Sequence, residues 1–186
     1  MKNEANIRYY GGDDDAVYVA PLGTPLPVGL EELPAAYVSP GFLDESGLED
    51  TVTETVNETK VHQGGRTAKT KINREKLEKK FVCTEENAVV AGLMHPGSTA
   101  STSVEGVTTR KNIQKTKSDP HVWVFDNYDE SVADLIHRRE IWSRGEVTAR
   151  GAVGRTASGA TLHEFTVTCT GTADTVTNDP AAAVAA

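Results

Sequence analysis

Alternating residue types between positions 48 and 61 form the clearest hydrophobic and polar pattern in this chain. Valines and glutamates at the even positions 52–58 alternate with threonines and one asparagine. Such alternation of β-branched residues predicts a long, half-exposed β-strand with carboxylates along one face. Gly64-Gly65 and a basic stretch over residues 66–80 follow. Together these segments predict a long hairpin whose two strands carry opposite charge.

The second half of this hairpin, residues 69–82, also has the composition of a helix. Its Arg-Glu-Lys-Leu-Glu-Lys-Lys segment has strong intrinsic helix propensity, and a helix places Leu77 and Phe81 one turn apart. A strand instead places Leu77, Phe81 and Cys83 on one face and lets opposite charges pair across the hairpin. We favour the strand, with the helix as the alternative.

Further strands are predicted by short apolar and β-branched segments. The near-continuous apolar run at residues 121–125 fits a central strand covered on both faces and is the best core candidate. Four prolines between positions 21 and 34 exclude regular pairing and predict an ordered loop, and residues 98–103 are also expected to be loop. The predicted strands are 16–20, 37–44 with a break at Pro40-Gly41, 104–113, 121–125, 133–143, 146–152 with Arg144-Gly145 before it, and 161–172.

One helix is predicted at residues 85–94. Thr84 is a suitable N-cap, and Glu85 and Glu86 suit the positive end of the helix dipole. The apolar residues of this segment fall on one face. We expect a single mainly β domain over residues 1–172, followed by a flexible C-terminal tail at 173–186, which lacks a core-forming pattern.

The charge distribution limits the classes of function. The formal net charge is -8, yet residues 1–60 hold 3 basic and 12 acidic side chains, whereas residues 61–80 hold 7 and 2. An acidic chain has few lysines and arginines to displace the counterions of phosphates, which argues against nucleic acid as a ligand. It is compatible with a surface that DNA passes without binding. No apolar run approaches the roughly 18 residues of a membrane span, and the first ten residues are polar, so we expect synthesis in the cytoplasm and no membrane segment.

Candidate chemistry is sparse. Cys83 and Cys169 lie in apolar β-like segments, which favours buried free thiols over a disulfide. The five histidines are far apart and form no metal-binding motif, so structural roles are favoured over metal ligation. The chain has no nucleophile elbow, phosphate loop or dinucleotide-binding glycine pattern. We expect no enzyme activity, no cofactor and no metal.

Several segments together resemble a known family. These are VYVAPLGTPLP at residues 17–27, AAYVSPGFLDESGLEDTVTETVNETKV at 35–61, and EIWSRGEVT at 140–148. They are similar to major tail tube proteins of long-tailed, siphovirus-type bacteriophages of actinobacteria. The likeness covers most of residues 16–172, and the basic stretch at 66–80 departs from the common pattern.

The resemblance implies a β-sandwich or partly closed barrel with one flanking α-helix and long loops. It implies a structural subunit that forms hexameric rings, stacked into a tube through which genomic DNA passes during ejection without specific binding. The implied partners are other copies of this chain, the tape measure protein, and the tail tip and terminator proteins. The implied location is the virion tail, assembled in the host cytoplasm.

Two groups of residues are the candidate sites of such a subunit. Glu49, Asp50, Glu54 and Glu58 are candidates for the lumen or for ring contacts, although carboxylates on an exposed strand are usually only solvated. The hairpin loop at 61–71 is the candidate ring-stacking element, with Gly64, Gly65, Arg66 and Lys69 as its named residues. The alternatives are a β-sandwich decoration or receptor-binding module of the virion, and a small-molecule-binding barrel. Only 6% of the residues are aromatic, which disfavours the barrel.

Overall fold

The computed structural model describes residues 7–60, 62, 67–102, 105–111, 118–131, 134–155, 157 and 159–182. Over these residues the chain is mainly β-strand, and the strands join in a multi-stranded antiparallel sheet. The predicted mainly β class is confirmed. In chain order the elements are β1 (Ala16–Pro21), β2 (Leu43–Lys60), β3 (Thr67–Cys83), α1 (Ala88–Met94), β4 (Thr99–Thr102), β5 (Thr108–Lys111), β6 (His121–Asp129), β7 (Ile136–Arg150), β8 (His163–Cys169), β9 (Ala173–Thr177) and the short 3-10 helix η3 (Pro180–Ala182).

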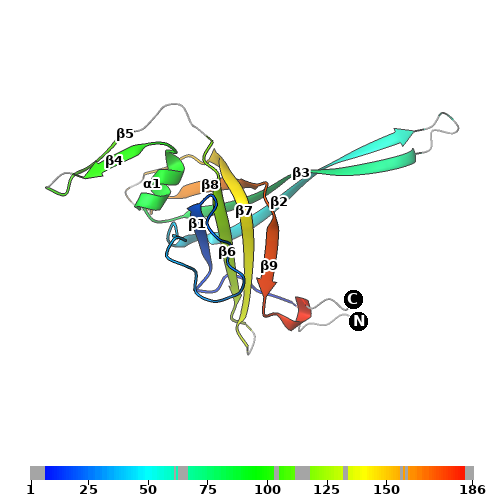
Figure 1. Ribbon diagram of the computed structural model, residues 1–186, viewed down its shortest axis with the longest axis horizontal. Coiled ribbons are helices and arrows are strands. Elements are labelled where there is room, and N and C mark those ends of the chain that lie inside the picture. The colour runs from blue at the N-terminus through cyan, green and yellow to red at the C-terminus, as the bar shows by residue number, and fades with distance from the viewer. Residues whose placement is uncertain are drawn as a thin grey trace.

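One long sheet forms the body of the molecule, with the strand order β1-β6-β7-β8-β3-β2 (Figure 1). Strand β7 connects its two halves, because the first part of β7 pairs with β6 and β9 and the last part pairs with β8. Strands β4 and β5 form a separate two-stranded hairpin next to α1. All of these pairings are antiparallel.

The aromatic core shows that this sheet curls over itself. The Phe81 ring on β3 lies 6.0 Å from Trp123 and 6.4 Å from Phe125 on β6, measured between ring centroids, although β7 and β8 separate these strands in the sheet. Phe165 on β8 completes the cluster at 5.5 Å from Phe81. Helix α1 packs its buried apolar residues against the same cluster. Because each ring buries a large apolar area, this cluster is the main stabilising contact of the body.

Strand β6 is covered on both faces, as the apolar run at 121–125 predicts. Trp123 and Phe125 point into the aromatic core, whereas Val122 and Val124 belong to a second cluster with Tyr37 and other residues. The proline-rich connection after β1 lies over this second cluster and is an ordered loop, as predicted. A strand buried on both faces has no polar alternation, which is why its sequence reads as a continuous hydrophobic run.

A buried arginine holds the same loop in place. The Arg139 guanidinium donates two hydrogen bonds of 2.8 Å to the Asp126 carboxylate, one to each oxygen. Its remaining terminal nitrogen donates to the carbonyl oxygens of Gly29 and Glu31 at 2.9 and 2.8 Å. The planar guanidinium has enough donors to satisfy both the carboxylate and the loop backbone.

The predicted long hairpin is confirmed, and the strand interpretation of residues 69–82 is right. Strands β2 and β3 pair in antiparallel register from Leu43↔Cys83 to Lys60↔Thr67. Phe81 and Cys83 are buried on the inner face of β3, and this burial overrides the local helix propensity of the lysine-rich segment. β2 begins at Leu43, and Val38 of the predicted 37–44 strand makes only an isolated bridge to Val19.

The helix was predicted to begin too early. Asn87 is the N-cap of α1, because its Oδ1 accepts hydrogen bonds from the backbone nitrogens of Val89 and Val90 at 3.0 and 2.9 Å. The predicted cap Thr84 instead donates from its backbone nitrogen to the carbonyl of Phe42 at 3.0 Å. Thr84 therefore continues the hairpin, which delays the start of the helix to Ala88.

Two other predictions of loops and strand breaks are wrong. Residues 136–150 form one continuous strand, β7, instead of two strands separated at Arg144-Gly145. Gly145 is accommodated within the strand because the Trp123 indole covers it and donates from Nε1 to its carbonyl at 3.1 Å. The expected loop at 98–103 contains β4, which pairs with β5. Of the predicted strand 104–113, residues 108–111 form β5, and residues 104, 112 and 113 lie outside the described residues.

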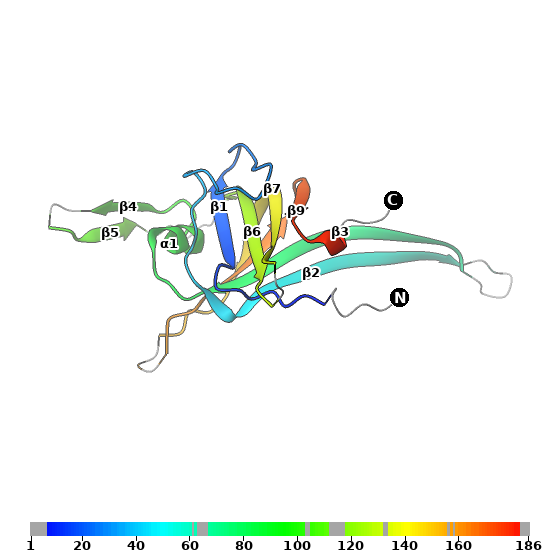
Figure 2. The same ribbon diagram turned by 90° about the horizontal axis from the view of Figure 1, so that it is seen from below.

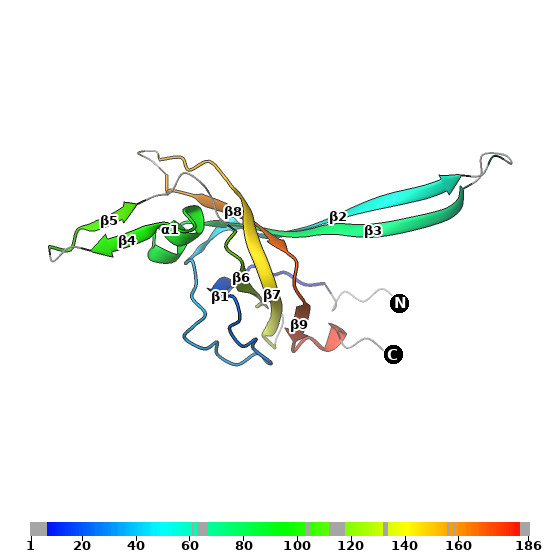
Figure 3. The same cartoon turned by 45° about the horizontal axis from the view of Figure 1, so that its top comes forward.

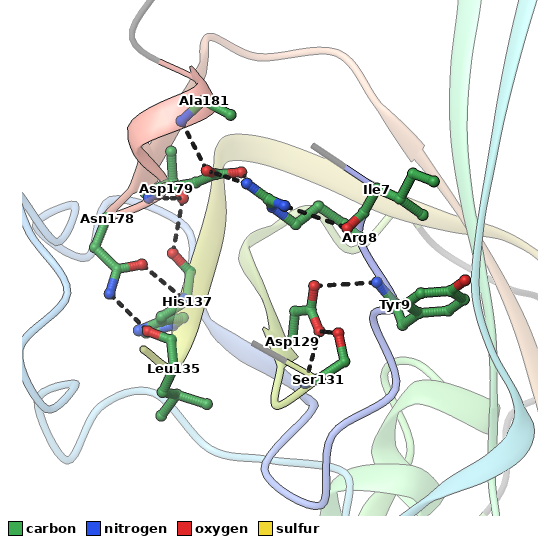
Figure 4. A network of polar contacts seen from close by, with 11 residues as sticks. Ile7, Arg8, Tyr9, Asp129, Ser131, Leu135, His137, Asn178, Asp179 and Ala181 are labelled. Atoms are coloured by element: carbon green, nitrogen blue, oxygen red, sulfur yellow. Dashed lines mark hydrogen bonds and ion pairs between the residues drawn. The ribbon is translucent and has the colours of Figure 1, made fainter. Parts of the chain in front are cut away.

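The predicted flexible tail is wrong for residues 173–182, which form β9 and η3. β9 pairs with β7, and the Asp179 carboxylate accepts two hydrogen bonds from Arg8 at 2.7 and 2.8 Å, so that the two ends of the described chain meet (Figure 4). Asn178 binds the backbone of Leu135 and His137 beside them. Strand pairing with β7 and polar contacts hold this segment in place. Such contacts leave no apolar periodicity in the sequence, so the order of the segment could not be predicted from it.

Both cysteines are buried free thiols, as predicted. Burial raises the pKa of Cys83 and the pKa of Cys169 to about 12. Both side chains belong to the aromatic core cluster. They act as small apolar groups, because the reactive thiolate form is strongly disfavoured there.

A substitution of Gly145 tests how tightly the curled sheet is packed. A Cβ at this position would lie 2.7 Å from Trp123 Cδ1 and 2.9 Å from Val167 Cγ1, both in buried side chains. We expect Gly145→Ala to lower the free energy of unfolding by about 1–3 kcal/mol, measured by urea denaturation. Gly154→Ala is the control, because its added Cβ meets nothing within 4 Å. Equal stability of the two variants would contradict the packing described here.

The Arg8–Asp179 pair gives the stability a defined pH dependence. The hydrogen bond from Arg8 is the main cause that holds the pKa of Asp179 below its ordinary value of 3.8. A depressed pKa in the folded state stabilises the fold above the ordinary pKa, and this contribution is lost as the pH falls through the folded-state value. The difference in free energy of unfolding between the wild type and Asp179→Asn should therefore shrink as the pH falls below about 4. Arg8→Ala should show the same trend, and a difference that grows on acidification would exclude this role of the pair.

Candidate functional site

An exposed two-stranded arm is the most distinctive feature of the surface. Strand β8 pairs with β3 only over residues 77–83, so residues 67–76 of β3 pair with β2 alone. We define the arm as residues 51–60 of β2 with residues 67–76 of β3. It extends from the body by about 30 Å, from the usual rise per residue of a strand. Figures 2 and 3 show the arm projecting away from the curled sheet.

Both long edges of the arm lack a neighbouring strand among the described residues. β2 is the last strand in the order of the sheet, and β3 has lost its contact with β8 before the arm begins. In an antiparallel strand every second residue directs its N–H and C=O outward, so each edge presents about five such residues. Unpaired edges of this length are templates for pairing with another chain. An isolated two-stranded ribbon is also only marginally stable by itself in water.

The two faces of the arm differ in chemistry. On the valine–glutamate face, Val52, Val56 and Ile72 are 46%, 54% and 61% exposed, and this face also carries Glu54 and Glu58. It is not purely acidic, because Arg74 is in register with Glu54 and Lys60 is the next residue after Glu58 on this side of β2. The opposite, threonine–lysine face consists of Thr51, Thr53, Thr55, Asn57, Thr59, Lys69, Lys71, Asn73 and Lys76, as the cross-strand register shows. The valine–glutamate face continues the inner face of the sheet, because Val52 pairs with Leu77, which packs against the core. Three exposed β-branched side chains in one row are a candidate contact surface.

The structure separates the four acidic residues singled out in the sequence. Glu49 is on the outer face of β2, in register with Lys80, whereas Asp50 is on the inner face, in register with Lys79. Glu54 and Glu58 are on the arm, on the same face as Asp50. The four carboxylates therefore do not lie on one face of β2, because Glu49 is on the face opposite the other three.

The predicted ring-stacking loop is described only in part. Lys69 is exposed on β3, where it lies in register with Thr59 near the end of the arm. Gly64, Gly65 and Arg66 lie outside the described residues. Residues 67–71 of the predicted loop belong to β3, and the ring-stacking role stays a prediction.

A buried ion-pair network lies in the body next to the start of the arm. The Lys79 ammonium, with a side chain only 3% exposed, donates to Asp50 Oδ2 at 2.7 Å and to Glu140 Oε2 at 2.5 Å. It also lies 5.2 Å from the centroid of the Phe125 ring. Arg138 contacts the other Glu140 oxygen at 2.8 Å. The network joins β2, β3 and β7 across the inside of the curled sheet, and it balances two carboxylates with two cations.

Lys79 and Glu140 were missed as site residues, although the sequence carries a signal for one of them. Lys79 has the same parity as Phe81 and Cys83, which are on the predicted core face of that strand. A charged residue at a core position indicates a buried partner, since an unpaired buried charge is very costly. Its partner Glu140 lies 61 positions further along the chain, which no local pattern can identify.

Two searches of the described residues limit the kinds of site that they form. No group of three or more His, Cys, Asp and Glu side chains in the described part of the chain converges to hold a metal ion. Among the same residues, no helix has the length and apolar character needed to cross a membrane. The candidate functional surface is the arm, which has two open edges, a valine–glutamate face and a threonine–lysine face.

Comparison with known proteins adds no relative. No protein-family model matches this chain, and no curated protein sequence matches it.

The Lys79 network makes a quantitative prediction about the two partners of the lysine. Lys79→Ala leaves the mostly buried Glu140 with Arg138 only, so we expect a loss of about 3 kcal/mol in the free energy of unfolding, measured in urea. Asp50→Asn should cost less than about 1 kcal/mol, because its side chain is 51% exposed and water replaces the lost contact. A larger loss for Asp50→Asn than for Lys79→Ala would show that the network is not centred on Lys79.

Proposed function

We propose that this protein is a structural subunit that assembles with copies of itself into stacked rings, forming the tail tube of a bacteriophage. The arm is the observation that carries the proposal. It leaves two long strand edges and a row of exposed valine and isoleucine side chains on the surface of one chain. Proteins that remain monomeric often cover such edges with a further strand, helix or loop, so a long pair of edges without a neighbouring strand among the described residues supports assembly with another chain.

The chemistry of the arm favours repeated assembly of one kind of subunit. Backbone edges pair with any strand, and a neighbouring copy of the same arm has edges of the same length. A contact between different surfaces of identical subunits repeats, and it closes into a ring or continues as a filament. A tube of stacked rings needs contacts that close within each ring and contacts that continue from one ring to the next. The number of six subunits per ring is taken from the family that the sequence resembles.

The curled sheet with one flanking helix supports a tail-tube-like fold. Its aromatic cluster stabilises the body without the arm, and the Lys79 network ties β2 and β3 to β7 just before these two strands leave the body as the arm. A rigid body with a projecting ribbon is suited to a subunit that must contact several neighbours at once. The tape measure protein and the tail tip and terminator proteins are the further partners that this function requires.

The charge of the chain suits a wall past which DNA moves. Duplex DNA carries about one negative charge per 1.7 Å, and a wall with few accessible cations forms few counterion-releasing contacts. Glu54 and Glu58 are the lumen or ring-contact candidates that lie on the projecting arm, whereas Glu49 and Asp50 lie in the part of β2 beside the body. Electrostatic repulsion extends over only about 8 Å at physiological salt, so it prevents sticking and does not drive ejection.

Negative-stain electron microscopy of the purified protein over a concentration series tests the assembly. We expect rings with a central hole at low concentration and stacked tubes at high concentration. The matched control replaces residues 54–75 by Asn-Gly, a two-residue turn that closes the Thr53↔Lys76 pair. This shortened chain should keep the unfolding transition of the body and remain monomeric.

Two results would contradict the proposal. Discrete closed trimers of the wild type would favour the decoration or receptor-binding module. Identical tubes from the wild type and the shortened chain would show that the arm does not direct assembly.

A further inference from the structure

A buried lysine lies between two carboxylates that come from different strands. Lys79 Nζ on β3 is 2.7 Å from Asp50 Oδ2 on β2 and 2.5 Å from Glu140 Oε2 on β7. The lysine side chain is only 3% exposed. A buried ion pair is often no more stabilising than apolar side chains of the same volume. Stability alone therefore does not account for this arrangement, and its three groups are a candidate for covalent chemistry.

Asp50 and Lys79 are placed for a bond between their side chains. They lie directly opposite each other in the register of β2 and β3, and paired residues flank them on both sides. The backbone thus holds the carboxyl group and the amine in contact. Holding two reacting groups together replaces an encounter in solution by an intramolecular step, equivalent to a concentration of about 10⁵–10⁸ M in the most favourable cases.

Glu140 is placed to move the protons that such a bond formation requires. Its Oε2 accepts a hydrogen bond from the Lys79 ammonium, which is the geometry of a general base. Its other oxygen contacts Arg138 at 2.8 Å, so the carboxylate has a fixed orientation. The Glu140 side chain is 12% exposed, whereas that of Asp50 is 51% exposed. Glu140 is therefore the better proton carrier, and a water molecule formed at Asp50 has a path to solvent.

The surroundings of Lys79 favour a neutral product. Its Nζ lies 5.2 Å from the centroid of the fully buried Phe125 ring. The ring attracts the ammonium, yet by less than it costs to remove an ammonium and a carboxylate from water. Condensation converts both charges into one uncharged amide, so it removes this cost.

We propose that the Lys79 amine and the Asp50 carboxyl group condense into a side-chain amide, with Glu140 as the catalytic residue. Glu140 takes a proton from the ammonium, and the freed nitrogen attacks Asp50 Cγ to form the new C–N bond. Glu140 then passes protons from the nitrogen to one Asp50 oxygen, whose bond to Cγ breaks as the oxygen leaves in water. Two of the three ammonium protons leave with the water, the third stays on the amide nitrogen, and Glu140 returns to its first state. No atom is oxidised or reduced.

The amide would join β2 to β3 where the arm leaves the body. Residues 50–79 would then form a covalently closed loop that contains the whole arm. A two-stranded ribbon is only marginally stable by itself, and a cross-link that closes a loop restricts the unfolded chain. The two strands of the arm would therefore stay joined at their base when the rest of the ribbon opens. The inference does not depend on whether the protein forms tubes.

Intact mass spectrometry of the purified full chain, denatured before measurement, tests the bond. We expect the wild type to be lighter than its sequence mass by one water molecule, and its protease digest to contain a branched peptide that joins Lys79 to Asp50. Asp50→Asn should lose ammonia instead and reach the same final mass as the wild type, because both chains form the same amide. Lys79→Met and Asp50→Ala should keep their full sequence masses.

Two further variants serve as the test of the catalyst and as the matched control. Glu140→Gln keeps both reacting groups and should form the amide at least tenfold more slowly, with a urea unfolding curve to verify that it folds. Lys80→Met removes the neighbouring lysine, which is 42% exposed and lies 3.2 Å from Glu164. It should lose one water molecule as the wild type does.

Each contrary outcome overturns a defined part of the inference. A wild type that keeps its full sequence mass after days at neutral pH would exclude the amide. Loss of water that persists in Lys79→Met would show that Asp50 cyclises with its own backbone, and if that variant does not fold, Asp50→Ala at the exposed carboxylate makes the comparison. A branched peptide that joins Lys79 to Glu140 would reverse the roles of the two carboxylates, and an unchanged rate in Glu140→Gln would exclude its catalytic role.

Discussion

Strand β3 lies in two environments, and the change between them at Leu77 organises the molecule. Over residues 77–83 it is paired on both sides, by β2 and β8, and Phe81 anchors the aromatic core. Over residues 67–76 it pairs with β2 alone. A strand paired on both sides satisfies its backbone groups within the chain, whereas a ribbon with two open edges leaves them to water or to another molecule. The end of β8 at Cys169, opposite Leu77, therefore sets the boundary between body and arm.

The contacts at this boundary fix the part of the body from which the arm projects. Lys79 binds one carboxylate on the partner strand β2 and one on β7, and it does so beside the Phe125 ring. Separating this buried cation from its partners is costly in a low-dielectric interior. The network thus holds β2, β3 and β7 together where the arm leaves the body. A subunit whose contact surfaces have a fixed relative orientation can form regular assemblies, because each head-to-tail contact repeats the same rotation.

The sequence predicted the elements whose pattern is local. The alternation around Val52 and Val56 and the apolar run at 121–125 were both read correctly, since burial on one or both faces leaves a direct periodic signal. Prediction from the sequence failed where a contact between distant residues determined the structure. Gly145 stays within β7 because Trp123 covers it, Asn87 caps α1 because Thr84 binds Phe42, and the C-terminal segment is ordered by Arg8 and β7.

The candidate site divides in the same way. The sequence by itself determined a long, charged hairpin with acidic residues on β2 and basic residues on β3, because alternation and composition are properties of consecutive residues. Only the tertiary structure decided which acids lie on the projecting arm, since Glu49 and Asp50 lie in the part of β2 beside the body. It also decided that Lys79 lies between Asp50 and Glu140. Such juxtapositions depend on the curl of the sheet and on long-range pairing, which sequence periodicity does not contain.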